Sequence, residues 1–313
     1  MAKFTGTAGG DSIGSSELGG GLDGHEIDAD EGDDTIASGA GPDTITAGPG
    51  DDRAFGQGGD DLIFGGPGHD FGNGNGGADT LFGEEGRDTL HGGASDDSLA
   101  GGDDADLLYG DLGADTVGGG KGDDEIWGDH PFAAGGPGND GDLLFGGRGN
   151  DLIHAGPGDD TAVGDRDDDT VLGEGGRDLL GGGEGRDLVD GGADDDTLDG
   201  GAGADTLVGG TGDDQLAGGD SDDTFVFGDG SGSDLITDFD PDHDRIIVEP
   251  GVNDTGIDDA DDLRGRLSED ADGNVVIDLG GGNRVTLGGV GLDDLLERPD
   301  GAPDPFGVGY FPQ

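Results

Sequence analysis

A nine-residue period runs through most of this chain and constrains its fold more than any other feature. From Ala29 to Val226, 22 consecutive units follow without a frame break, as in SGAGPDTIT (38–46) and GGAGADTLV (200–208). The sixth position is Asp in 21 of the 22 units, Ala133 being the exception, and the eighth is mostly Ile, Leu, Val or Phe. Such a period is the signature of a repeat architecture in which each unit is one supersecondary element.

Each unit predicts a tight turn followed by a short strand. The first six residues are rich in Gly, which turns at little steric cost, and the last three are often Thr, Leu, Ile or Val. In such a strand the eighth side chain points to one face and the seventh and ninth to the other. Two units then form one 18-residue coil. The sequence therefore predicts an all-β fold, a parallel β-roll (β-solenoid) over residues 29–226.

The composition indicates that this fold needs an external source of free energy. Of 313 residues, 79 are Gly and only 29% are hydrophobic, which is typical of disordered chains. The formal net charge of −62 favours cations and disfavours nucleic acid and anionic membrane surfaces as partners. No stretch approaches the roughly 20 apolar residues of a membrane span. Because the chain has no cysteine, disulfides and thiolate metal sites are excluded.

The consensus GGxGxDxUx resembles the RTX (hemolysin-type) calcium-binding repeat. The resemblance covers residues 29–226 closely, and Gly6–Gly14 and Gly20–Asp28 more loosely. Residues 222–248 and 273–295 resemble the C-terminal segment that follows these repeats in serralysin-like proteases and many type I-secreted proteins. The resemblance implies that calcium ions lie between successive turns of one column, each ion taking the aspartates of both turns.

Same-side turns recur every second unit, so the expected aspartate ligands form two columns. One column is Asp34, Asp52, Asp70, Asp88, Asp106, Asp124, Asp142, Asp160, Asp178, Asp196 and Asp214. The other is Asp43, Asp61, Asp79, Asp97, Asp115, a gap at Ala133, then Asp151, Asp169, Asp187, Asp205 and Asp223. With one ion in each interval, the resemblance implies about 18 calcium ions. Acids at the fifth position either face solvent or add a ligand; among them are Asp33, Asp51, Asp60, Asp123, Asp159 and Asp213.

The N-terminus gives no sign of a conventional export signal. MAKFTGTAGGDSIGSS has one Lys and no apolar core, so it is not a Sec-type signal peptide. The resemblance instead implies export by a type I secretion apparatus, guided by an uncleaved C-terminal signal. Extracellular calcium reaches the affinity range of such open sites and cytosolic calcium does not. We therefore expect an extracellular, secreted protein that folds on calcium after export.

Outside the repeats we expect three further segments. Residues 1–28 carry degenerate repeats or an N-terminal cap, and residues 227–300 form a C-terminal β-rich cap. Within that cap DLITDF, RIIV, NVVIDL and RVTL predict strands, and 259–267 predicts a helix. The tail 301–313 is Pro-rich, too short to cover the last coil, and part of the expected secretion signal.

Two irregular stretches leave alternatives open. GDHPFAAGG (128–136) keeps the repeat length but lacks the Asp and the apolar residue, so we expect a loop that bulges out. Residues 238–249 place Asp at EF-hand spacing, but His243 stands where that loop needs Gly. This stretch is either a polar turn or one more calcium site.

An outward aromatic stripe is expected beside the irregular loop. Tyr109, Trp127 and Phe145 are spaced 18 residues apart, which predicts one face of successive coils. The stripe is either a shelf for Pro131–Phe132 or a patch for a glycan or another partner.

The chain carries no convincing catalytic constellation. GDSIG (10–14) matches G-x-S-x-G, but it lies in the repeat frame rather than in a strand–turn–helix. His25–Glu26 begins an H-E-x-x-H string, but Ala29 stands where the second His is needed. We therefore expect a non-enzymatic calcium-binding repeat protein. The alternatives are an adhesin or surface module that binds ice or glycans, and the C-terminal part of a secreted hydrolase.

Overall fold

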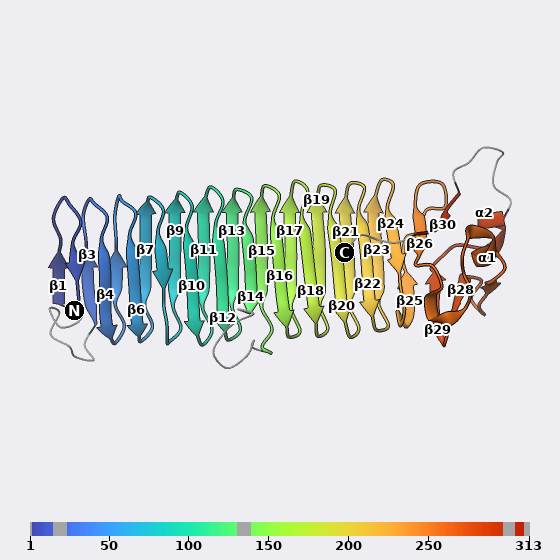
Figure 1. Ribbon diagram of the computed structural model, residues 1–313, viewed down its shortest axis with the longest axis horizontal. Helices are drawn as coiled ribbons and strands as arrows, with labels where there is room; N and C mark the ends of the chain where they lie inside the picture. Colours follow the sequence, from blue (N-terminus) through green and yellow to red (C-terminus); the bar gives the residue numbers. More distant parts are fainter. Residues whose placement is uncertain (1, 15–23, 130–138, 297–303, 310–313) are drawn as a thin grey trace. The chain divides into compact units, whose positions relative to one another are not determined.

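The computed structural model describes residues 2–14, 24–129, 139–296 and 304–309. The chain divides into two compact units, Met1–Ala162 (unit 1) and Val163–Gln313 (unit 2), with the boundary inside strand β17 (Thr161–Arg166). Each unit is a parallel β-solenoid whose strands lie side by side in two sheets (Figure 1). The predicted fold class is confirmed.

In unit 1 the strands alternate between two sheets, so that each coil contributes one strand to each sheet. The first sheet contains β1 (Ala2–Thr5), β3 (His25–Asp28), β5 (Thr44–Thr46), β7 (Leu62–Pro67), β9 (Thr80–Glu85), β11 (Ser98–Asp103), β13 (Thr116–Lys121) and β15 (Leu143–Arg148). The second contains β2 (Ser12–Ile13), β4 (Thr35–Ala40), β6 (Arg53–Gly58), β8 (Phe71–Asn73), β10 (Thr89–Ala94), β12 (Leu107–Leu112), β14 (Glu125–Asp129) and β16 (Leu152–Pro157).

Unit 2 continues this alternation and ends in a segment of different structure. Its first sheet contains, in spatial order, β19 (Leu179–Glu184), β21 (Thr197–Ala202), β23 (Gln215–Asp220), β25 (Ser233–Ile236), β29 (Asn283–Leu287), β28 (Val275–Gly280) and β27 (Leu267–Glu269). Its second sheet contains β18 (Thr170–Gly175), β20 (Leu188–Ala193), β22 (Thr206–Thr211), β24 (Thr224–Phe227), β26 (Arg245–Val248) and β30 (Phe306–Val308).

The coil length and the core follow from the repeat. Thr35 pairs with Arg53, and Thr44 pairs with Leu62, 18 residues further on in each case. The eighth-position side chains fill the interior, as Ile36 and Leu81 illustrate with no exposed area. The seventh and ninth positions point outward, as the alternation predicts.

Two positions of the repeat unit adopt a positive φ in the turn, and glycine is frequent at both. Gly120 and Gly122, at the second and fourth positions, have φ values of 115° and 139°. This backbone region is unfavourable for residues with a Cβ atom and open to Gly. Glycine therefore allows the tight turn at little cost, although Gln57, Glu84 and Asp111 adopt the same positive φ at the second position of their units.

The C-terminal segment of unit 2 contains the expected strands together with elements that the sequence did not predict. A helix was expected over 259–267, and α1 spans Ala260–Arg264 with an N-terminal capping box from Asp259 and Asp262. The η1 turn (Val252–Asp254), β27 and α2 (Leu292–Leu296) were not expected. The strands β27, β28 and β29 pair antiparallel, and β29 joins the roll by pairing in parallel with β25.

The prediction that the tail covers nothing is wrong. Phe306 lies in β30, which pairs with β26, and only 3% of Phe306 is exposed. The sequence argument relied on the length and Pro content of the tail, but three residues suffice to add a strand to an open edge. Among the described residues no helix has the length and apolar character needed to cross a membrane.

Candidate metal sites

The sixth-position aspartates of unit 1 lie in two buried columns at the turns. In each column the Oδ1 atom of one Asp accepts the backbone N–H of the Asp one coil earlier, for example Asp34 N to Asp52 Oδ1 at 2.7 Å and Asp43 N to Asp61 Oδ1 at 2.7 Å. The first column is Asp34, Asp52, Asp70, Asp88, Asp106, Asp124 and Asp151. The second is Asp43, Asp61, Asp79, Asp97, Asp115, Asp142 and Asp160.

This order corrects the predicted columns beyond residue 124. Asp124 was expected to precede Asp142, but its N–H donates to Asp151, and the N–H of Asp115 donates to Asp142, both at 2.8 Å. One coil is 27 residues long here, because it holds an extra nonapeptide that includes Ala133. Ala133 therefore leaves no gap in a column. The loop expected at 128–136 lies mostly outside the described residues.

Two columns of the same kind occur in unit 2, and each gains a residue that the repeat frame missed. One contains Asp169, Asp187, Asp205 and Asp223 and continues to Asp244. The other contains Asp178, Asp196 and Asp214 and continues to Asp234. The signal for Asp234 was present, since Gly230, Gly232, Asp234 and Ile236 keep the repeat offsets after a two-residue insertion. Asp244 and Ile246 keep the Asp and apolar offsets of the repeat, but Asp stands at 240 and 242 where the repeat has Gly.

In most of these aspartates the second carboxylate oxygen is buried without a hydrogen-bond donor. This holds for Oδ2 of Asp34, Asp43, Asp52, Asp61, Asp70, Asp79, Asp88, Asp97, Asp106, Asp115, Asp124, Asp142, Asp187, Asp196, Asp205, Asp214, Asp223 and Asp234. A buried charged oxygen without a partner is costly, so each needs a proton or a cation beside it.

Glycine at the first position of the unit leaves the room in which such a cation would lie. A Cβ atom on Gly83 would lie 2.2 Å from Oδ2 of Asp88 and 2.5 Å from the carbonyl oxygen of Gly101. The same two kinds of oxygen surround Gly191, where a Cβ would lie 2.4 Å from Oδ2 of Asp196. One carboxylate and one carbonyl oxygen thus converge on each space that a side chain would fill.

Burial raises the pKa of these carboxyl groups far above the ordinary value of 3.8. Desolvation raises the pKa of Asp97 and of Asp106 to about 8, with smaller contributions from the aspartates above and below in the column. The pKa of Asp61 rises to about 7 for the same reasons. Charge on these groups is unfavourable unless a cation compensates it.

The donor atoms fit a hard cation. Among the described residues, no three His, Asp or Glu side chains converge on one point. The candidate sites instead offer a carboxylate oxygen beside a backbone carbonyl oxygen, and oxygen donors of both kinds are typical of Ca²⁺ sites. The fifth-position acids have a different role, because Oδ1 of Asp33 accepts the N–H of Asp51 at 3.1 Å and Oδ1 of Asp51 accepts that of His69 at 3.0 Å.

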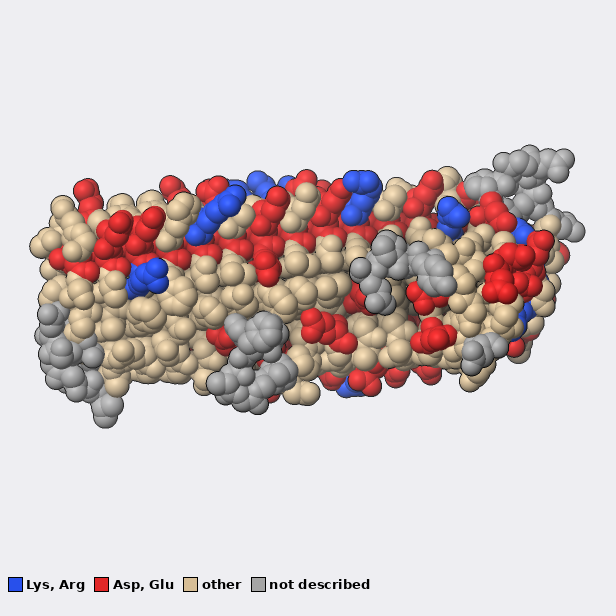
Figure 2. Space-filling view, in the orientation of Figure 1, with Lys and Arg blue, Asp and Glu red and all other residues tan. Residues whose placement is uncertain are grey.

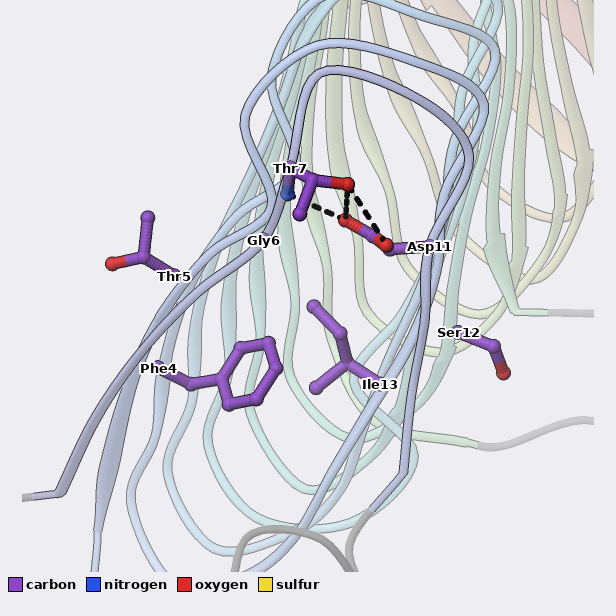
Figure 3. Close-up of a pocket in the computed structure, with 7 residues that line it drawn as sticks. All are labelled: Phe4, Thr5, Gly6, Thr7, Asp11, Ser12 and Ile13. Carbon is purple, nitrogen blue, oxygen red and sulfur yellow. Dashed lines mark hydrogen bonds between the residues drawn. The ribbon is translucent and has the colours of Figure 1, made fainter.

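Both columns of unit 1 have protein donors at their N-terminal ends. Asp11 continues the first column, since its N–H donates to Oδ1 of Asp34, and its own carboxylate accepts the N–H of Thr7 at 2.6 Å and the Thr7 hydroxyl (Figure 3). At the start of the second column, Nδ1 of the buried His25 lies 2.9 Å from Oδ1 of Asp43. The two short motifs that resemble catalytic sequences thus lie within this first part of the roll.

The EF-hand-like stretch is arranged as a turn. Asp238 accepts the N–H groups of Gly218 and Gly219, while Asp244 accepts the N–H of Asp240 at 2.7 Å. His243 pairs with Asp222 at 2.7 Å. The carboxylates therefore serve separate backbone groups, which favours the polar-turn alternative.

The predicted aromatic stripe is wrong in one member. Tyr109 and Trp127 lie on β12 and β14 of the second sheet, but Phe145 lies on β15 of the first. The 27-residue coil brings His154 rather than Phe145 next to Trp127, with ring centroids 3.7 Å apart and planes 5° from parallel.

Acidic side chains gather in a band along the turns of unit 1, beside a broad face of other residues (Figure 2). The fold and these columns define a calcium-binding repeat protein. The family model for the RTX calcium-binding nonapeptide repeat matches residues 26–45, 38–72, 73–108, 91–126, 136–171, 172–207 and 199–234, more than half of the chain. The chain belongs to this family.

Other comparisons add little. No curated protein matches the chain. The extracellular lipase LipA from Serratia marcescens is 19% identical, with 72% of this chain and 40% of the lipase covered and a TM-score of 0.29. The chain thus spans less than half of that enzyme, and the similarity is too low to support an argument about function.

Proposed function

We propose that the column aspartates are calcium ligands and that calcium binding drives the folding of the chain. The observation that carries the proposal is the row of buried Oδ2 atoms without a hydrogen-bond donor, several of which lie beside a backbone carbonyl oxygen, as at Gly83 and Gly191. Ca²⁺ between successive aspartates would supply the missing partner and neutralise the pair. Because such ions bind only the folded roll, they stabilise it by mass action.

The number of ions follows from the intervals within the columns. One ion between successive aspartates gives six in each column of unit 1 and, with Asp234 included, three in each column of unit 2. Asp244 is left out because its two carboxylate oxygens accept the N–H groups of Asp223 and Asp240. The total equals the 18 expected from the sequence. Each ion offsets two of the 62 net negative charges, so the ions relieve much of the self-repulsion.

We further infer that the protein is exported unfolded by a type I apparatus and acts outside the cell. The support is chemical, because open sites of this kind fill at extracellular rather than cytosolic calcium concentrations. Membership in the RTX family supports the same route. The proposal assigns calcium binding, and no catalytic role, to the described residues.

Circular dichroism tests the folding proposal directly. Purified full-length protein in chelator should lack most of its β-signal and gain it cooperatively on addition of millimolar Ca²⁺. Mg²⁺ at the same concentration is the control and should do little, because it demands tighter octahedral geometry. A β-spectrum that chelator leaves unchanged would contradict the proposal.

A further inference from the structure

Three consecutive units near the start of unit 1 carry a side chain at the first position of the repeat, where glycine is usual. These side chains belong to Ala29, Ser38 and Ala47, and each of them has no exposed area. The nine units that follow all begin with glycine, from Gly56 to Gly128. The N-terminal coils therefore differ from the coils after them at a position that borders the candidate ion space.

In the glycine units this position has room for a cation but not for a methyl group. A Cβ atom on Gly56 would lie 2.2 Å from Oδ2 of Asp61 and 2.9 Å from the carbonyl oxygen of Gly74. A Cβ atom on Gly65 would lie 2.5 Å from Oδ2 of Asp70. A carbon atom cannot stay this close to an oxygen, so a methyl group takes the room between the two oxygens and forces them apart.

Ser38 also changes the hydrogen bonding of one expected ligand. Its hydroxyl donates to the carbonyl oxygen of Gly56, one coil further on, at 2.8 Å. This carbonyl is the counterpart of the Gly101 carbonyl, which faces the space beside Gly83. In the interval that follows Asp43, a hydroxyl hydrogen therefore lies on the oxygen that would otherwise face a cation.

The aspartates of these three units still attract a cation. Oδ2 of Asp34, of Asp43 and of Asp52 is buried without a hydrogen-bond donor, as in the glycine units. The charge is thus the same in both kinds of interval, and the room beside the charge is smaller in the first three. Weak binding, rather than no binding, follows from this combination.

We propose that the intervals following Asp34, Asp43 and Asp52 form a second, weaker class of calcium site, which the side chain at the first position of the unit determines. This rests on the proposed function, which assigns the column aspartates to calcium. The affinity of the weaker class should be lower by about tenfold or more, because overpacking of this size is costly. The roll then responds to calcium over a wider range of concentration than equal sites would allow.

Equilibrium dialysis of the full-length protein against buffered free calcium tests the two classes. The weaker class should hold about three ions per chain, one for each filled position. The double variant Ser38→Gly with Ala47→Gly should move two of these ions to the tighter class, although glycine ordinarily destabilises a strand. Ala54→Gly, a buried side chain in the unit of Ala47, is the matched control and should leave both classes unchanged.

A single class of site in the natural chain would overturn the proposal, and so would a double variant whose weaker class keeps its size. Failure of every variant to bind calcium would instead overturn the proposed function. The two failures are therefore distinguishable.

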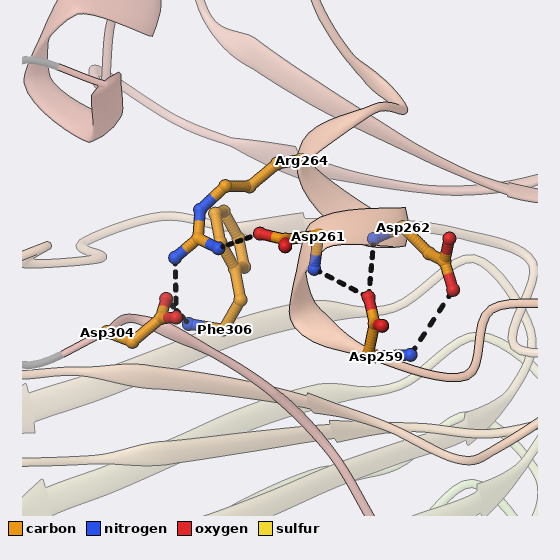
Figure 4. Close-up of polar contacts among 6 residues, drawn as sticks. All are labelled: Asp259, Asp261, Asp262, Arg264, Asp304 and Phe306. Atoms are coloured by element: carbon orange, nitrogen blue, oxygen red, sulfur yellow. Dashed lines mark hydrogen bonds and ion pairs between the residues drawn. The ribbon is translucent and has the colours of Figure 1, made fainter.

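Exposed carboxylates provide a further control, because they are numerous and lie outside the columns. In the C-terminal segment of unit 2 the Arg264 guanidinium donates to Asp261 and Asp304, and Asp259 accepts the N–H of Asp261 (Figure 4). Asp261→Asn changes one such exposed group and should leave the weaker class unchanged. A weaker class that shrinks in this variant would contradict its assignment to the first coils.

Anomalous difference maps from crystals soaked at limiting calcium locate the weaker class directly. The peaks that follow Asp34, Asp43 and Asp52 should fade before the peaks between Asp70 and Asp115 in the two columns. Peaks that fade equally in all intervals would overturn the proposal while leaving calcium binding itself established.

Discussion

The backbone N–H of Asp115 donates to Oδ1 of Asp142, 27 residues further along the chain, at 2.8 Å. The same bond joins Asp124 to Asp151, also 27 residues apart, whereas between Asp34 and Asp124 it joins aspartates 18 residues apart, for example Asp97 and Asp115. One coil therefore takes in an extra nonapeptide without interrupting the column. The turn geometry and the aspartate register, rather than a constant coil length, are what the roll preserves.

This pairing predicts which aspartates are energetically coupled. A double-mutant cycle on Asp115→Asn and Asp142→Asn, read as the calcium midpoint of folding, should show an interaction of about 0.5–3 kcal/mol. The matched cycle on Asp124→Asn and Asp142→Asn, which the uninterrupted repeat frame would pair, should be additive within about 0.5 kcal/mol. The reverse result would restore the columns expected from sequence.

The glycine cradles predict position-specific intolerance to a methyl group. Gly83→Ala would place a Cβ 2.2 Å from Oδ2 of Asp88 and 2.5 Å from the Gly101 carbonyl, so it should raise the calcium midpoint and cost about 1–3 kcal/mol of unfolding free energy. Gly118→Ala is the control, since no atom lies within 4 Å of its added Cβ. Equal calcium titrations for the two variants would show that the cradle holds no ion.

The raised pKa values predict that protonation of the buried carboxylates at low pH partly stabilises the folded roll when calcium is absent. Asp97 and Asp106 have pKa values of about 8 in the folded roll against 3.8 ordinarily, so the calcium-free folded state binds more protons than the unfolded state. Stability in chelator is then greatest near pH 4 and falls as pH rises towards 8. The β-signal in chelator should accordingly be larger at pH 4.5 than at pH 8. A calcium-free β-signal that grows with pH would contradict the burial of these carboxylates.

The stability of unit 2 should depend on its last strand, β30, and above all on the burial of Phe306. Phe306→Ala removes a side chain that is only 3% exposed and should lower the free energy of unfolding of unit 2 by about 3 kcal/mol. Thermal unfolding in saturating calcium checks this, with Leu296→Ala, an exposed side chain on α2, as the control. An unchanged melting temperature for Phe306→Ala would restore the sequence-based view that the tail covers nothing.

The repeat made the roll, its inward residues and 21 column aspartates predictable, because a nine-residue period determines the turn, the strand and the face of every side chain. The sequence could not predict that Asp142 follows Asp115, rather than Asp124, in its column. An extra unit of nine residues leaves the repeat frame intact, and only the pairing of the strands in space reveals it. Asp244 and the strand at Phe306 depend on contacts between distant segments, which no local period encodes.

The most direct test of the central claim is an anomalous difference map from crystals grown in Ca²⁺. Peaks should lie between successive aspartates of each column, including the interval between Asp115 and Asp142 and the interval between Asp214 and Asp234. Each peak should be within bonding distance of carboxylate and carbonyl oxygens, at about 2.3–2.6 Å. A folded roll whose columns hold no such peaks would contradict the account.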